Sequence, residues 1–289
     1  MPCSLWTPVS SKALLLCLTL ASLATSHRPS TPPIRRRSVE VTPALCVKVC
    51  EFAQPSDLVQ AHYDDVDDAE PDPFGLVLWP GALFAARRLC EHDINGGVAG
   101  RTCLVMGAGT GLEALTAAAL GAERVLACDY NELTLELLDI AAQESGLDGR
   151  IECCLFDMAT DLPLPAAADV HVYADVLYTR ELAQHVARRW RAELWGEGGS
   201  SQRLMLTDSQ KFHSAAFLDA LNAPAGVDTE DDESERAALE IGTSDRRRIE
   251  WQQARLDSFT GSGILVEEDQ TYDAEVRYLD LDSASLRVK

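Results

Sequence analysis

Short apolar runs alternate with amphipathic stretches along the middle of the chain. The amphipathic stretches place apolar residues at helical spacing and predict helices, among them 133–142 and 181–194. The apolar runs predict strands at 103–106, 124–128, 150–157, 168–175 and 202–208. Strands separated by helices in this way form βα units, whose strands pair in parallel. The pattern therefore predicts an α/β fold around a mostly parallel sheet.

Different patterns flank these βα units. Residues 39–52 alternate between apolar and polar positions and predict a strand pair. Pro80 suits the first turn of a helix that carries an apolar stripe. The acidic residues near 226–240 predict a solvated insertion, and residues 263–281 predict two further strands around a short turn.

The N-terminal charge pattern differs from that of the rest of the chain. No Asp or Glu precedes Glu40, and Lys12 stands before an apolar run, residues 13–24, that is too short to span a bilayer. A basic stretch rich in Ser, Thr and Pro follows. We therefore expect a targeting segment over residues 1–39, of a signal and transit type that leads to an organelle such as a plastid. The secretory pathway is the alternative, as is the cytoplasm if the start is misassigned.

Overall charge limits the partners. The chain has 46 acidic residues against 25 Lys and Arg, a net charge of −21. This charge disfavours nonspecific binding to nucleic acid or to an anionic membrane and favours a basic partner, although solubility alone explains it equally well. The nine cysteines include no spacing that completes a metal set, so no metal is expected.

Three glycines connect the first predicted strand of the βα region to its helix. Gly107, Gly109 and Gly111 have the spacing GxGxG, and Leu112 occupies the place of the third glycine in a dinucleotide-binding turn. Asp129 ends the next strand, where a carboxylate can accept hydrogen bonds from a ribose diol. This corner predicts an adenosine-containing cofactor and leaves nicotinamide dinucleotide and S-adenosylmethionine both open.

A set of motifs in order adds a resemblance. "GLVLWPGA", "GAGTGL" with "ACDYN", and "ADVLY" follow one another, and a predicted hairpin ends the chain. Over residues 40–289 the chain resembles the seven-stranded S-adenosylmethionine-dependent methyltransferases, and among them the lysine methyltransferase-like group called methyltransferase family 16. The resemblance implies a Rossmann-like sheet with an antiparallel last strand inserted at the edge, and S-adenosylmethionine as cofactor.

The resemblance also implies roles for individual residues. Asp129 would hold the ribose, and Asp175 and Tyr178 would be the catalytic residues that face the methyl group and an incoming amine. The residues implied in cofactor binding are Trp79, Gly107, Ala108, Gly109, Gly111, Asp129, Asp157, Met158 and Ala174. Two departures from the family pattern are Met106, where an acid is common, and Ala141 or Ala142, where an asparagine is common.

The expected function is a protein-lysine N-methyltransferase with a protein substrate, and no nucleic acid or membrane partner. A small-molecule methyltransferase, a catalytically degenerate methyltransferase fold that only binds a partner, and a nicotinamide oxidoreductase are the alternatives. Structural roles compete for four residues. Trp79 can be a core aromatic, and Asp175 can cap the helix that follows it. Asp129 can be a solvated acid at a strand end, and Tyr178 can serve in packing alone.

Overall fold

The computed structural model describes residues 33–54, 73–91, 97–195, 202–223, 248–261 and 268–286. A folded unit begins at Ile34. Most of the predicted targeting segment and the whole acidic insertion near 226–240 lie outside the described residues, so both stay predictions. Within the described ranges, every helix falls short of the length or the apolar character that crossing a bilayer requires.

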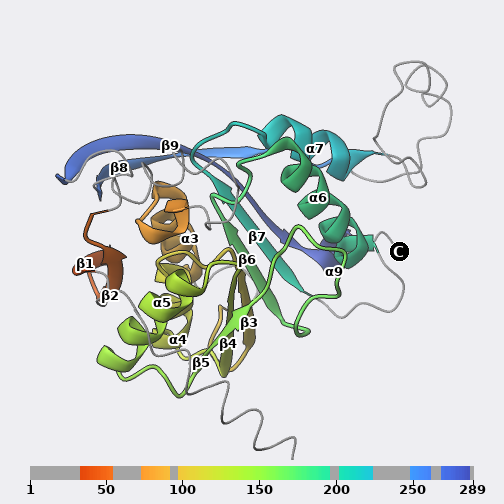
Figure 1. Cartoon of the computed structure of the whole chain (residues 1–289). Coiled ribbons are helices and arrows are strands. Elements are labelled where there is room, and N and C mark those ends of the chain that lie inside the picture. The colour runs from red at the N-terminus through yellow and green to blue at the C-terminus, as the bar shows by residue number, and fades with distance from the viewer. Residues whose placement is uncertain are drawn as a thin grey trace, which may run out of the picture. The chain divides into compact units, whose positions relative to one another are not determined.

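A seven-stranded sheet in the order β5-β4-β3-β6-β7-β9-β8 forms the centre of this unit (Figure 1). Its first five strands in that order are parallel, and β9 is antiparallel to both β7 and β8. The α/β prediction, with a mostly parallel sheet and an antiparallel C-terminal hairpin, is confirmed. The strands are β3 (Thr102–Met106), β4 (Arg124–Asp129), β5 (Ile151–Leu155), β6 (Val170–Ala174), β7 (Arg203–Asp208), β8 (Gln252–Gly261) and β9 (Gln270–Asp282).

Helices cover both faces of this sheet, which explains why its central strands are continuous apolar runs. Alternate residues of β3 show the two layers: Cys103 and Val105 pack in one hydrophobic cluster, and Leu104 and Met106 pack in the other. The helices of the first layer are α3 (Pro80–Cys90), α4 (Leu112–Ala119) and α5 (Glu132–Glu144), and those of the second are α6 (Arg180–Trp195) and α7 (Ser214–Asn222).

The C-terminal hairpin begins earlier than the sequence pattern predicts. Its first strand is β8, which ends at Gly261, so the prediction of both strands within 263–281 is wrong. Only Leu256, Phe259 and Gly261 of β8 are buried, and this mostly polar strand therefore lacks the apolar run that marks the others. The last strand, β9, lies between β7 and β8, which makes β8 the edge strand.

Strands β1 (Ile34–Thr42) and β2 (Leu45–Phe52) form a separate antiparallel pair. β1 begins before the boundary predicted at residue 39, because two of its arginines have partners in the folded unit. Arg35 and Arg37 each place a guanidinium nitrogen 2.8 Å from the fully buried carboxylate of Glu51. The other oxygen of Glu51 accepts a hydrogen bond from the backbone N–H of Leu78 at 3.0 Å, which holds the segment that leads into α3.

Candidate active site

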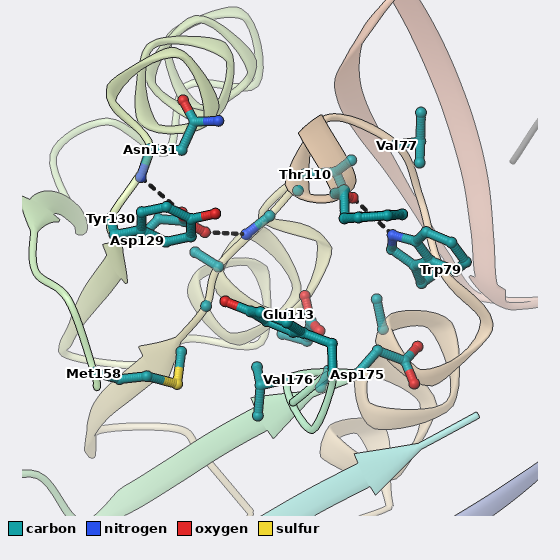
Figure 2. A pocket seen from close by; sticks show the side chains of 18 residues that line it. Val77, Trp79, Thr110, Glu113, Asp129, Tyr130, Asn131, Met158, Asp175 and Val176 are labelled. Carbon is teal, nitrogen blue, oxygen red and sulfur yellow. Dashed lines mark hydrogen bonds between the residues drawn. The ribbon is translucent and has the colours of Figure 1, made fainter. Parts of the chain in front are cut away.

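A cavity of about 660 Å³, counted with its open mouth, lies at the carboxyl ends of β3, β4 and β6 (Figure 2). The carboxyl edge of a parallel sheet is where open α/β folds bind their ligands. The cavity draws its walls from the segment before α3, the glycine turn, the ends of β4 and β6, and the first turn of α4. Its lining includes the predicted residues Trp79, Gly107, Ala108, Gly109, Asp129, Met158, Ala174, Asp175 and Tyr178.

The glycine turn brings backbone to the cavity wall. Gly107, Gly109 and Gly111 all have positive φ, at 65°, 51° and 73°, a conformation that side chains with a Cβ rarely adopt. A Cβ on Gly107 would lie 2.7 Å from the Val176 side chain, whereas a Cβ on Gly109 would approach nothing closer than 3.4 Å. The turn is thus closely packed at Gly107, and Gly109 lies in ordinary contact distance of the Gly75 backbone while it lines the cavity.

Asp129 is joined to the glycine turn. One of its carboxylate oxygens accepts a hydrogen bond from the backbone N–H of Gly109 and the other from that of Asn131, both at 3.0 Å. The residue is 5% exposed and lines the cavity. The two amides hold the carboxylate of Asp129 in a fixed position at the cavity wall.

Trp79 ends the segment before α3, where its side chain both packs against Phe74 and lines the cavity. Its indole N–H donates a hydrogen bond to the carbonyl of Phe74 at 2.7 Å, and the two rings are 6.3 Å apart. The same side chain lines the cavity beside Val77. Packing fixes the ring, and its exposed part forms one wall.

Asp175 has a strained backbone and an engaged carboxylate. Its φ of 54° is rare for a residue other than glycine. One carboxylate oxygen accepts a hydrogen bond from Gly81 N–H at 2.7 Å, in the first turn of α3, and the other from Ser209 N–H at 2.6 Å. Asp175 therefore caps α3, while Thr179 caps α6 through a hydrogen bond from Leu182 N–H at 3.1 Å. The alternative of a cap for the following helix is wrong.

The surroundings of Asp175 set its charge. Burial raises the pKa of its carboxyl to about 6, while the hydrogen bonds from Ser209 and Gly81 oppose that rise. Asp175 is consequently a carboxylate at pH 7 and gains a proton in mildly acidic solution. Tyr178, three residues on, is 42% exposed and lines the cavity as well.

Two predicted cofactor residues lie outside the lining. Gly111 leaves room for α5, because a Cβ there would lie 2.2 Å from a methyl carbon of Leu138. Asp157 is exposed, and its carboxylate accepts a hydrogen bond from the backbone N–H of Ala159 at 2.8 Å. Gly111 thus allows the glycine turn to pack closely against α5, and Asp157 forms a hydrogen bond within its own loop. Contact of either residue with a cofactor stays a prediction.

The sequence pattern missed one acidic residue of the lining, Glu113 in α4. It is 2% exposed, and its Oε2 has no hydrogen-bond partner among the described residues. An acid in the first turn of a helix is common and stabilising, so its position alone does not mark this one as buried. The only signal was a single charge within the otherwise apolar helix "LEALTAAA".

Comparison with known protein families finds a match over the part of the chain that contains the glycine turn and Asp129. Residues 104–193, from β3 through most of α6, match the model of a family described as "Methyltransferase domain". This segment is thus similar to a methyltransferase domain. The similarity supports the expectation of an S-adenosylmethionine-dependent methyltransferase, and it does not extend to methyltransferase family 16.

Curated relatives match the methyltransferase domain over part of their length. The ribosomal protein L11 methyltransferase of Edwardsiella ictaluri (strain 93-146) is 34% identical over 122 residues, which are 39% of this chain and 40% of the relative. That of Sorangium cellulosum (strain So ce56) is 40% identical over 79 residues, 27% of this chain and 24% of the relative. The chain thus spans less than half the length of these relatives.

Among solved structures, the T. thermophilus 16S rRNA N2 G1207 methyltransferase in complex with AdoMet and guanosine has 17% sequence identity and a TM-score of 0.45. The similarity covers 68% of this chain and 48% of that one.

The residues of the cavity fit S-adenosylmethionine. The backbone of Gly107, Ala108 and Gly109 and the carboxylate of Asp129 line the cavity, and the lining also includes the apolar side chains of Phe74, Val77 and Met158.

Proposed function

We propose that this chain is an S-adenosylmethionine-dependent N-methyltransferase that acts on a lysine side chain of a protein. One observation carries the proposal: a single cavity joins the glycine turn and Asp129 to Asp175 and Tyr178. The glycine turn and Asp129 suit binding of the cofactor. Asp175 and Tyr178 suit binding of an acceptor amine. The resemblance to methyltransferase family 16 supports lysine as the acceptor.

In this proposal the cofactor lies along the carboxyl edge of β3 and β4. The backbone of Gly107, Ala108 and Gly109 approaches it, Asp129 accepts hydrogen bonds from its ribose, and Met158 packs against its adenine. Trp79 and Ala174 form further walls. Bound S-adenosylmethionine supplies a methyl group that transfers from a sulfonium to a nucleophile.

The acceptor amine must lose a proton before it can act as a nucleophile. A lysine with a pKa of about 10.4 is neutral in only about 0.04% of molecules at pH 7, equivalent to about 4.6 kcal/mol. A cavity with little water lowers this cost, because desolvation lowers the pKa of an amine. The Asp175 carboxylate and the Tyr178 hydroxyl would orient the remaining N–H bonds, and positioning of this kind contributes much of a rate enhancement.

Two further observations support a protein as the acceptor. The relatives that match this chain are named for methylation of a ribosomal protein. The net charge of −21 favours a basic partner. A sequence of the NPPY type, suited to amide or nucleobase nitrogen, is absent from the chain.

A second candidate function follows from the hydrogen bonds of Asp175. Both of its oxygens already accept backbone N–H groups, which also suits a methyltransferase fold that binds a partner without transferring a methyl group. Transfer of label distinguishes the two functions.

The test is incubation of the purified full chain with radiolabelled S-adenosylmethionine and a cell or organelle extract. We expect a labelled protein band, and mass spectrometry should then place the methyl group on lysine. The Asp129→Asn variant should lose most of the label, whereas Asp282→Asn, which changes a carboxylate outside the cavity lining, should keep it. Label in a small molecule would identify the small-molecule alternative, and cofactor binding without any label would identify the binding-only fold.

A further inference from the structure

Glu113 is an acid of the cavity lining that the proposed mechanism does not use. It belongs to the first turn of α4, directly after the glycine turn, and Figure 2 shows it between Thr110 and Asp175. Its exposed fraction of 2% contrasts with that of ordinary first-turn acids, which face solvent. Its Oε2 is buried without a hydrogen-bond partner among the described residues.

Nothing in the cavity lining compensates a charge on Glu113. The lining contains no Lys, Arg or His, and its other titratable side chains are Asp129, Tyr130, Asp175 and Tyr178, none of them a cation. Burial raises the pKa of Glu113 to about 8, opposed by a hydrogen bond from its own backbone N–H and aided by the nearby charge of Asp175. A buried polar group without a partner is costly, which makes Glu113 a position where a ligand can supply the missing donor.

We propose that Glu113 binds the ammonium group of the amino-acid part of the cofactor. This assignment rests on the proposed function. The ammonium is the group of S-adenosylmethionine that combines positive charge with N–H donors, whereas the sulfonium has no hydrogen to donate. The ribose already has an acceptor in Asp129, next to the glycine turn. Glu113 is near enough to Asp175 for their charges to interact, so it lies on the side of the cavity toward the acceptor.

The test compares three ligands by calorimetry of the full chain: S-adenosylmethionine, S-adenosylhomocysteine and 5′-methylthioadenosine. The last keeps the adenosine but lacks the amino-acid part. For Glu113→Gln we expect affinity for the first two ligands to fall roughly 10- to 100-fold, the cost of a charged hydrogen bond, while affinity for 5′-methylthioadenosine stays within about twofold. Unchanged binding of that ligand also shows that the variant retains its cavity.

The matched control is Glu132→Gln. Glu132 also stands in the first turn of a helix, α5, but it is exposed and does not line the cavity. We expect this variant to bind all three ligands as the wild type does. Equal losses for the three ligands in Glu113→Gln, no loss at all, or an effect only on the acceptor's KM would each overturn the assignment. A wild-type chain that binds none of the ligands would instead overturn the proposed function.

Proton release gives a second measurement. A cation that pairs with Glu113 favours its carboxylate form, so at pH 7, below the pKa of about 8, binding must expel a proton. Calorimetry in buffers of different ionisation enthalpy should show release of close to one proton by the wild type and close to none by Glu113→Gln. Asp175 contributes little at this pH because its carboxyl is already ionised. Equal release by both proteins would contradict the assignment.

Discussion

The two halves of the cavity are built differently. Most of the cofactor half comes from one continuous segment, the end of β3 through the glycine turn and α4 to Asp129 and Asn131 after β4, to which Trp79 and Met158 add walls from elsewhere in the chain. The acceptor half joins residues far apart along the chain. Asp175 accepts its hydrogen bonds from Gly81, which is 94 residues away, and from Ser209, which is 34 residues away.

Local structure therefore determines the position of Asp129, whereas tertiary packing determines the position of Asp175. In the cofactor half, a short loop and two adjacent parallel strands determine where Asp129 meets the glycine turn. In the acceptor half, Asp175 keeps its strained backbone because α3 and the end of β7 hold its carboxylate. Substitutions should therefore perturb binding in the first half and catalysis in the second.

The largest effect should come from Gly111→Ala, at the base of the cofactor half. Positive φ alone costs about 1 kcal/mol for alanine, and here the new methyl group would also overlap Leu138. We expect a loss of several kcal/mol in the free energy of unfolding, measured by denaturant titration. Gly100→Ala is the control, because Gly100 has a similar φ of 69° and no atom within 4 Å of a Cβ. Equal losses in both variants would contradict close packing at Gly111.

Asp129→Asn should weaken binding of S-adenosylmethionine roughly 10- to 100-fold, because it removes a charged acceptor from the ribose site. Calorimetry measures the affinity, and Asp282→Asn provides a control that also changes a carboxylate bonded to a backbone amide, away from the cavity lining. Unchanged affinity in Asp129→Asn would remove this residue from the cofactor site.

Asp175→Asn should lower kcat at least about tenfold and change cofactor affinity less than about threefold, because the charge acts on the acceptor half. The pH profile sharpens this prediction. The reaction needs the carboxylate, so wild-type kcat should fall as the pH decreases through about 6, the pKa of this carboxyl.

The variant should lose that acidic limb of the profile while keeping the rise at higher pH that comes from the acceptor amine. A stability measurement accompanies the assay, since Asp175 also caps α3. Normal turnover in a folded Asp175→Asn protein would exclude the catalytic role.

The smallest effect should come from Tyr178→Phe. Tyr178 is largely accessible to solvent, so loss of its hydroxyl should leave stability and cofactor affinity unchanged. Turnover should fall by a few-fold if that hydroxyl orients the amine. Identical kinetics in steady-state assays would assign Tyr178 to packing at the cavity mouth.

The sequence predicts most of the sheet because burial on both faces makes the middle of β3, β4, β6 and β7 mostly apolar. The sequence pattern does not predict β8 at its true position, because most residues of this edge strand are exposed and polar. The same contrast holds in the site. Asp129 is predictable because it follows a strand at a fixed place after the glycine turn, whereas Glu113 resembles any solvent-exposed acid at a helix start. The partners of Asp175 are set by packing between distant segments, which no local pattern records.

The most direct test is a crystal structure of the full chain with S-adenosylhomocysteine. The account predicts ligand density along the glycine turn, with the ribose hydroxyls about 3 Å from the Asp129 carboxylate and the amino group beside Glu113. Density elsewhere on the protein, or a ribose that makes no contact with Asp129, would contradict it.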